Sequence, residues 1–515
     1  MISIPTALSR RVLMPLRPLP IVLLPLVGLV FLDGAGRLPG ADWPGFRGSS
    51  SHDATSSETG LLREWPAEGP PLLWTVTGIG RGGGGVVIQN DTAYLFAKEK
   101  KAKKGKPPPD PQKLTGTCLV ALNMADGTIR WQYKYSRGGI NATPTINGKF
   151  VYVRTGGTAA CLSAEDGKII WETDVQKLLA EAHPGWQDKT RYDSWAGSPV
   201  IDEKHMYVNV GSPKLSVVAL HLKDGSVAWA GTGPPEMEGR GYGSPTLFKH
   251  AGKDLLVTTT VIHVLGFDPT TGALLWSHRL QDRPKPHCGI GNVPVYADGL
   301  LHVSSKYGGP IAKAFQLADD GSSIKEAWNN PSIHPYQESV TCVDGRLFGN
   351  GSLLWEHCDQ EVLVDGEPLG ERIKLLGKAK FAKTGLSKMV AGRNKEKLNN
   401  LDLTCGLICQ DLKTGKVLGF RTGLGVGAPY SGPICLAADG MLYVIYSTNF
   451  NKLYLIDASP AMTIRGQVST PIPERDLSKV NWTGYTTPSL SNGRLVVRYD
   501  DMMFCYKVDQ GPSQK

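Results

Sequence analysis

Alternating apolar and polar positions, separated by tight turns, run through most of this chain. The clearest example is a phrase that recurs as ADGTIRWQYK, EDGKIIWETD, KDGSVAWAGT and TTGALLWSHR. In each copy a glycine precedes a tryptophan by four positions, and a small residue followed by an apolar one stands upstream. The pattern predicts a β-hairpin whose turn uses the positive φ that glycine tolerates. The pairs are Gly127 and Trp131, Gly167 and Trp171, Gly225 and Trp229, and Gly272 and Trp276.

A second recurring phrase stands upstream of each hairpin. It reads ATPTINGKFVYV, GSPVIDEKHMYV and GSPTLFKHAGKDLLV in three copies. Each copy fits a strand, a polar turn and a second strand, and its proline belongs near a strand start or on an edge because it has no N–H. Joined to the tryptophan hairpin, the phrase gives four short antiparallel strands per unit. Its prolines are Pro144, Pro199, Pro245, Pro294, Pro433 and Pro488.

Repeated four-strand units predict a β-propeller, because one such sheet cannot bury both of its faces alone. We expect an all-β, eight-bladed β-propeller of four-stranded antiparallel blades, with each tryptophan buried between neighbouring blades. The last unit, residues 486–508, lacks its tryptophan strand. Residues 70–76, which include Trp74, are expected to supply that strand and to close the ring.

The later units depart from the pattern. In the fifth unit Trp328 follows Gly321 by seven positions, and in the sixth Phe420 is expected to replace the tryptophan. Insertions on a propeller emerge at one face, and they are the parts in which one propeller differs from another. We expect three insertions, at about 98–114, 178–197 and 354–402, with a short helix possible at 387–399.

The N-terminus has the features of an export signal. Three arginines precede the apolar run LPIVLLPLVGLVFL, which is short for a membrane span and is followed by small residues. A leader cleaved near Ala41 or Asp42 is favoured over an anchor, and SRRVLM also resembles a twin-arginine signal. We expect an extracytoplasmic protein, periplasmic or secreted, that is membrane-associated only if the leader stays attached. The predicted domains are a signal peptide and leader over 1–41, one propeller over 42–510 and a tail over 511–515.

The phrase VALNMADGTIRW and its copies resemble the repeat of pyrroloquinoline-quinone (PQQ) type propellers, A-L-D-x-x-T/D-G-x-x-x-W. The start DWPGFRG at 42–48 is similar to the opening of many secreted bacterial proteins of this superfamily. The resemblance covers roughly residues 42–508 and is to quinoprotein-like and BamB-like bacterial β-propellers. It implies the fold strongly and the function poorly, since one fold hosts many functions. The third position of the repeat holds Asn123, Ser163, His221 and Asp268.

An enzymatic alternative follows from the same resemblance. Quinoprotein dehydrogenases of this superfamily use PQQ with Ca²⁺, a catalytic aspartate and a disulfide between adjacent cysteines. None of the nine cysteines in this chain is adjacent to another. No Glu–Asn–Asp calcium set is placed on the repeats, although Ca²⁺ needs six to eight oxygen ligands. We therefore predict no cofactor and no catalytic or metal-ligating residue, with PQQ and Ca²⁺ retained only under the alternative of a PQQ-dependent oxidoreductase.

Other chemistry has weaker support. A G-x-S-x-G elbow is missing, and His183, His287 and His334 are interpreted as ordinary loop residues. The segment GIGRGGGGVV at 78–87 lacks the Lys-Ser/Thr ending of a phosphate loop and is interpreted as a flexible lead-in to the first inner strand. The net charge of +9 comes largely from lysine-rich runs that fit solvated loops. With an export signal, this composition disfavours a nucleic-acid partner.

The function favoured by the sequence is an exported, non-catalytic binding or scaffold module in the bacterial cell envelope. An envelope protein or a polysaccharide is the expected partner, and we expect a monomer with no transmembrane span beyond the signal segment. A ligand site is expected at the funnel formed by the blade-start phrases and the 178–197 insertion, where aromatic, charged and hydroxyl side chains gather. The candidate residues are Asn141, Trp186, Arg191, Tyr192, Ser198, Tyr242 and Ser244.

Overall fold

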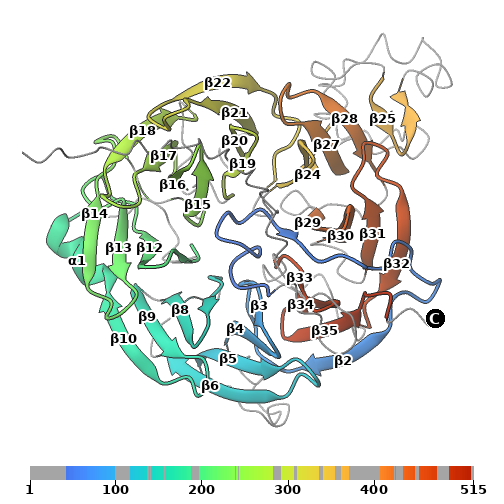
Figure 1. Cartoon of the computed structure of the whole chain (residues 1–515), viewed down its shortest axis with the longest axis horizontal. Coiled ribbons are helices and arrows are strands. Elements are labelled where there is room, and N and C mark those ends of the chain that lie inside the picture. Colours follow the sequence, from blue (N-terminus) through green and yellow to red (C-terminus); the bar gives the residue numbers. More distant parts are fainter. Residues whose placement is uncertain are drawn as a thin grey trace, which may run out of the picture. The chain divides into compact units, whose positions relative to one another are not determined.

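In a computed structural model the chain forms eight small, largely antiparallel sheets around a central axis, which confirms the predicted propeller (Figure 1). Each sheet is one blade. The described residues belong to the unit Gly40–Lys515. They are residues 42–98, 116–135, 139, 141–155, 157–186, 197–237, 239, 241, 243–281, 292–306, 310–335, 340–353, 361–369, 406–422, 424, 433–446, 452–471 and 486–511.

The first five blades have four strands each, with the first strand nearest the axis and the fourth at the rim (Figure 1). Their strands, in blade order, are β3 (Val87–Gln89), β4 (Thr92–Lys98), β5 (Thr117–Asn123) and β6 (Ile129–Tyr135); β7 (Thr145–Asn147), β8 (Phe150–Thr155), β9 (Thr158–Ser163) and β10 (Ile169–Asp174); β11 (Val200–Ile201), β12 (His205–Asn209), β13 (Val217–His221) and β14 (Val227–Gly231); β15 (Thr246–His250), β16 (Lys253–Thr259), β17 (His263–Phe267) and β18 (Leu274–Arg279); and β19 (Val295–Ala297), β20 (Leu300–Ser305), β21 (Ile311–Leu317) and β22 (Ile324–Asn329).

The sixth blade gains two strands from its own insertion, and the seventh and eighth each gain one from the N-terminal part of the chain. The strands of the sixth blade are β23 (Thr341–Val343), β24 (Arg346–Gly351), β25 (Leu363–Val364), β26 (Glu367–Pro368), β27 (Gly406–Asp411) and β28 (Val417–Arg421). Those of the seventh are β29 (Pro433–Ala438), β30 (Met441–Tyr446), β31 (Lys452–Asp457), β32 (Ile464–Ser469) and β1 (Thr55–Ser56), and those of the eighth are β33 (Ser489–Ser491), β34 (Arg494–Tyr499), β35 (Met502–Lys507) and β2 (Leu72–Thr77). The β25–β26 hairpin covers the rim of the sixth blade, because β25 pairs with β28 in parallel. On the seventh blade, β1 pairs in parallel with the inner strand β29.

The strand β2 is the outer strand of the eighth blade, as the sequence predicts. It pairs antiparallel with β35 and places Trp74 opposite Cys505. An N-terminal strand and three C-terminal strands therefore share one sheet. The outer side of β35, which would otherwise be an open edge, is paired with β2. The predicted ring closure is confirmed.

Each repeated tryptophan docks on the glycine turn of the next blade. The Trp131 Nε1 donates to the carbonyl oxygen of Ala164 at 3.0 Å. A Cβ on Gly167 would lie 2.5 Å from the Trp131 ring, and the φ of +71° at this position also requires glycine. The same indole-to-carbonyl bond joins Trp74 to Met124, Trp171 to Leu222, Trp229 to Pro269, Trp276 to Gly321 and Trp328 to Leu412.

The small residue of the repeat makes room for the indole within its own blade. Ala121 pairs directly with Trp131 across β5 and β6, and a β-bulge follows at the next position. In the fourth blade Gly266 takes this place, where a Cβ would lie 2.2 Å from the Trp276 ring. The repeat therefore specifies two neighbours of each indole: the turn of the next blade and the small residue on the adjacent strand. Trp74, Trp171 and Trp276 are buried, while Trp131, Trp229 and Trp328 are partly buried.

The expectation that Phe420 replaces the tryptophan of the sixth blade is wrong. The strand register places Gly419 opposite Cys409, which is the tryptophan position, and Phe420 opposite Ile408. A shift of one residue turns a side chain to the other face of the sheet. The space of the missing indole is taken by the next blade, since a Cβ on Gly419 would lie 1.9 Å from the carbonyl oxygen of Pro460.

The N-terminal residues 42–58, here called the axial segment, lie inside the ring (blue in Figure 1). Trp43 exchanges two backbone hydrogen bonds of 2.8 Å with Ile88 on the inner strand β3. The carbonyl oxygen of Pro44 accepts from the N–H of Ile146 on β7 at 2.7 Å. The carbonyl oxygen of Ser50 accepts from β15, and β1 pairs with β29. One short segment thus bonds the inner strands of blades on several sides of the axis.

Two charged side chains fix the axial segment to further blades. Arg47 is buried, and its Nη2 donates to the carbonyl oxygen of Val340 at 2.7 Å and to Thr341 Oγ1 at 3.2 Å. The carboxylate of Glu58 accepts from the N–H of Asn492 at 2.8 Å and of Gly493 at 2.7 Å. With these bonds the axial segment reaches the first, second, fourth, sixth, seventh and eighth blades.

The predicted insertions lie between strands of the propeller. The 178–197 insertion begins within a helix, α1 (Val175–Ala182), whose N-cap Asp174 accepts from the N–H of Lys177. The first half of the 354–402 insertion contains the β25–β26 hairpin. Three predictions lie outside the described residues: most of the insertion at 98–114, the possible helix at 387–399 and the predicted leader over 1–41.

Trp171→Ala is expected to lower the free energy of unfolding by about 3–5 kcal/mol, because it removes a buried aromatic ring and its bond to Leu222. Urea denaturation followed by intrinsic fluorescence measures this loss. Ile170→Ala is the matched control, since Ile170 directly precedes Trp171 on β10 and is 47% exposed. A cost for Ile170→Ala equal to that for Trp171→Ala would contradict the docking role of the indole.

Arg47→Ala is expected to cost about 2–4 kcal/mol, because it leaves buried carbonyl acceptors without a charged donor. Arg63→Ala on the same N-terminal stretch is the control. Arg63 pairs with Asp439 at 2.7 Å but is 58% exposed, so its loss should cost less than about 1 kcal/mol. Equal midpoints for the two variants in urea would show that the axial segment does not hold the ring.

Candidate functional site

The predicted site lies on the face of the ring that carries the connections between blades, here called the long-connection face. Asn141 is exposed there, and Trp186 is partly buried. Ser198 and Ser244 are buried, at 2% and 3% exposure. The other three candidates, Arg191, Tyr192 and Tyr242, lie outside the described residues.

The hydroxyl groups of the blade-start phrases bond one blade to the next. The N–H of Gly85 donates to Thr143 Oγ1 at 2.7 Å, the N–H of Thr143 to Ser198 Oγ at 2.8 Å, and the N–H of Ser198 to Ser244 Oγ at 2.9 Å. This chain of bonds crosses the first four blades. Thr143, Ser198 and Ser244, which precede Pro144, Pro199 and Pro245, therefore join the inner ends of neighbouring blades. In the sequence, the hydroxyl residue before these prolines is the signal for this role.

Trp186 follows the helix α1 and lies beside His183. The two rings stack with centroids 5.9 Å apart, and the N–H of Trp186 donates to the carbonyl oxygen of His183 at 3.2 Å. Because this aromatic pair is only partly buried, it offers a stacking surface on the long-connection face. Asn141 lies near the glycine-rich segment, since a Cβ on Gly83 would come within 2.8 Å of its Oδ1.

The glycine-rich segment, expected to be a flexible lead-in, is packed around a buried arginine. Arg498 Nη1 donates to the carbonyl oxygens of Gly84 and Phe96, at 3.3 and 2.8 Å, and Nη2 to that of Gly80 at 3.3 Å. A Cβ on Gly82 would lie 2.2 Å from Nη2, so a larger residue does not fit. Burial lowers the pKa of Arg498 to about 10, with nearby aspartates opposing the shift. The glycines serve close approach to this guanidinium.

A serine and a histidine meet on the same face, at the sixth blade. His334 precedes β23, Ser352 follows β24, and Ser352 Oγ lies 3.3 Å from His334 Nε2. His334 Nδ1 lies 2.7 Å from the carbonyl oxygen of Pro331. No local sequence pattern marks this pair, because the two residues lie in separate strand connections.

Burial holds several titratable side chains in their neutral forms. It lowers the pKa of His52 and of His302 to about 3, and that of His334 to about 4. It also raises the thiol pKa to about 12 at Cys161, Cys342, Cys409 and Cys505. Thiols with such pKa values are poor nucleophiles at neutral pH.

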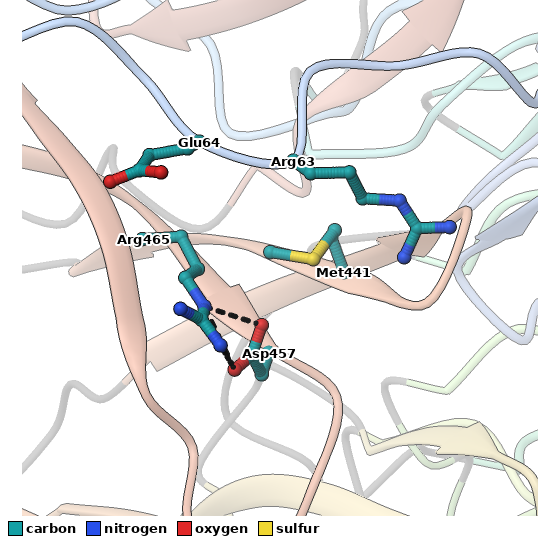
Figure 2. A pocket seen from close by; sticks show the side chains of 5 residues that line it. All are labelled: Arg63, Glu64, Met441, Asp457 and Arg465. Carbon is teal, nitrogen blue, oxygen red and sulfur yellow. Dashed lines mark hydrogen bonds and ion pairs between the residues drawn. The ribbon is translucent and has the colours of Figure 1, made fainter.

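The opposite face carries a shallow charged pocket of about 310 Å³ beside the seventh blade (Figure 2). Its lining includes Arg465, whose guanidinium makes a bidentate pair with Asp457 at 2.8–3.0 Å. Glu64 and Arg63 point away from this pair (Figure 2). Because Asp457 already neutralises Arg465 and Asp439 pairs with Arg63, the pocket holds no unmatched positive charge from these two arginines.

Two features are absent from the ranges that the structure describes. No group of three or more His, Cys, Asp or Glu side chains there is arranged to hold a metal ion. No helix in the same ranges has the length and apolar character needed to cross a membrane.

Comparison with known proteins gives a family match. The sequence model of the family described as "Outer membrane protein assembly factor BamB" (PQQ_2) matches residues 114–372. Tetrathionate hydrolase of Acidithiobacillus ferrooxidans is 25% identical over 209 residues, a match that covers 38% of this chain and 38% of that protein. The matched part of this chain thus spans well under half of that relative's length.

Solved structures share the fold at low identity. BamB from Moraxella catarrhalis is 12% identical with a TM-score of 0.51, over 85% of this chain and 98% of that chain. Quinohemoprotein alcohol dehydrogenase from Comamonas testosteroni is 11% identical with a TM-score of 0.58, over 94% and 82%. A europium-containing methanol dehydrogenase is 12% identical with a TM-score of 0.53, over 89% of each chain. At these identities the likeness shows the fold alone.

Lowering the pH from 7.5 to 5 is expected to destabilise the protein through its buried histidines. Each has a folded pKa of about 3–4, below its usual 6.5, so the unfolded chain binds protons first. The stabilisation is complete above pH 6.5 and is lost as the pH falls toward the folded values, by about 1.4 kcal/mol per pH unit for each histidine.

His302→Leu isolates one histidine, because neither ring nitrogen of His302 has a hydrogen-bond partner. Urea denaturation at pH 7.5, 6 and 5 should show a shallower loss of stability for this variant than for the parent. His221→Gln, at an exposed position, is the control. A parallel pH dependence for His302→Leu and the parent would contradict the assignment.

Proposed function

The chain belongs to the PQQ-repeat propeller family described as outer membrane protein assembly factor BamB, and from this we propose that it is an exported binding or scaffold module of the bacterial cell envelope. The proposal rests on one observation: the residues that recur in the repeat serve to join the blades. The tryptophans, glycines and blade-start hydroxyls are engaged in blade-to-blade contacts. They build a rigid ring, and a rigid ring presents its long-connection face as a fixed surface.

The proposed contact surface is the part of the long-connection face that contains Asn141 and the Trp186–His183 pair. An aromatic face and an exposed amide suit either a sugar ring or a protein side chain. We propose an envelope protein or a polysaccharide as the partner and the extracytoplasmic side of the membrane as the location. The leader predicted over 1–41 is the part of the sequence that supports this location.

We propose that no quinone cofactor binds at the axis of this ring. The axial segment occupies the space between the inner strands β3, β7, β15 and β29. Cys118, Cys161, Cys342, Cys409 and Cys505 lie on five different strands, so no two of them form the adjacent pair expected above a quinone. We therefore propose that the chain acts without PQQ, and the PQQ-dependent oxidoreductase is the alternative to be tested.

Photo-crosslinking from the long-connection face is expected to capture the partner in the native envelope. Benzoylphenylalanine at position 186 or 141 should give a discrete crosslinked species that mass spectrometry identifies as an envelope protein or a glycan. The same probe at Glu165, exposed on the opposite face, should give none. Crosslinks from position 165 alone, or equal products from all three positions, would contradict the proposed surface.

Addition of PQQ and Ca²⁺ to the purified protein is expected to produce no dye-linked oxidation of alcohols or sugars. The reason is the occupied axis and the lack of a suitable cysteine pair. Dye reduction is followed with and without PQQ, with a known quinoprotein as the positive control. Turnover that requires PQQ would overturn the binding-module proposal in favour of the oxidoreductase.

A further inference from the structure

The Ser352–His334 contact rests on a short backbone pairing. Ile333 and Gly351 form an isolated β-bridge. On either side of it, the N–H of His334 donates to the carbonyl oxygen of Asn350 at 3.0 Å, and the N–H of Ser352 donates to that of Ser332 at 3.0 Å. The backbone therefore sets the two side chains next to each other.

The hydrogen bond at Pro331 decides which imidazole nitrogen faces the serine as an acceptor. A carbonyl oxygen only accepts, so His334 Nδ1, 2.7 Å from it, carries the proton. In the neutral ring Nε2 is then the acceptor, and Ser352 Oγ, at 3.3 Å, is the donor. Burial keeps the ring neutral, since it lowers the pKa of His334 to about 4.

This arrangement has the parts of an activated hydroxyl: a nucleophile, a neighbouring base, and a third group that orients the base. We infer that Ser352 is a nucleophile that takes an acyl group from an activated ester, with His334 Nε2 as its base. This inference goes beyond the binding role and does not depend on the identity of the partner.

The step balances within the two residues and the ester. Ser352 Oγ attacks the acyl carbon while its proton moves to His334 Nε2. The ester C–O bond then breaks, and the leaving alkoxide or phenolate takes that proton from the imidazolium. The products are an acylated Ser352 and a free alcohol or phenol, and His334 returns to its neutral form.

The exposure of Ser352 and the burial of His334 suit this chemistry. Ser352 is partly exposed on the long-connection face, whereas His334 is only 6% exposed and is sheltered from water. Lys306 is tied to the same connection, because its N–H donates to the carbonyl oxygen of Pro335 at 3.0 Å. Its positive charge adds to burial in lowering the pKa of His334, and so helps to keep the ring neutral before the attack.

The test uses p-nitrophenyl acetate with the full-length protein. We expect one equivalent of p-nitrophenolate per chain and acetylation at Ser352, located by peptide mass spectrometry. Ser352→Ala should abolish this modification, and His334→Gln should slow it by about 100-fold, within the range of general-base catalysis. Ser322→Ala, at an exposed hydroxyl in a turn, should leave the rate unchanged.

A structural role for His334 is separated from a chemical one by rescue. Imidazole added to a His334→Gly variant should restore acetylation of Ser352 at least about tenfold, which a packing role alone would not produce. Circular dichroism and melting temperatures confirm that each variant is folded. Acetylation of Ser352 no faster than of Ser322, or an unchanged rate in folded His334→Gln, would overturn the inference.

Discussion

The docking of each indole on the glycine turn of the next blade is the contact on which the ring depends. It combines a hydrogen bond from Nε1, a ring face against a turn without a Cβ, and a small residue across the strand. These three requirements fall on different blades and different strands. A single tryptophan therefore constrains the distance and the angle between its own sheet and the next one.

The repeat made the fold readable from sequence because every requirement recurs at a fixed spacing. The spacing of Gly127 and Trp131 predicted both the hairpin and the buried indole, and the lack of a strand at the C-terminus predicted the role of residues 70–76. The prediction for Phe420 was wrong because it assigned the tryptophan position to the residue after Gly419, which occupies that position in the strand register. A glycine in the tryptophan position carries no apolar signal, so Gly419 was invisible to a search for apolar residues.

The axial segment and the candidate site were harder to predict, for physical reasons that differ. The axial segment bonds mainly through backbone groups and occurs once, so neither side-chain pattern nor repetition marks it. Ser198 and Ser244 have the side chains of a ligand site, but their hydroxyls accept bonds from neighbouring blades. Sequence alone does not tell which way a hydroxyl faces. The contact between Ser352 and His334 depends on a β-bridge between two loop ends, which no local pattern encodes.

The position of the axial segment has a consequence for the order of events during folding. Glu58 bonds to Asn492 and Gly493, residues separated from it by 434 and 435 positions. Contacts of such long range are slow to form, because the chain between them must be ordered first. The axial segment therefore completes its contacts only after the eighth blade has formed. The ring is therefore complete only when a segment that precedes the first blade in the chain has bonded to the last blade.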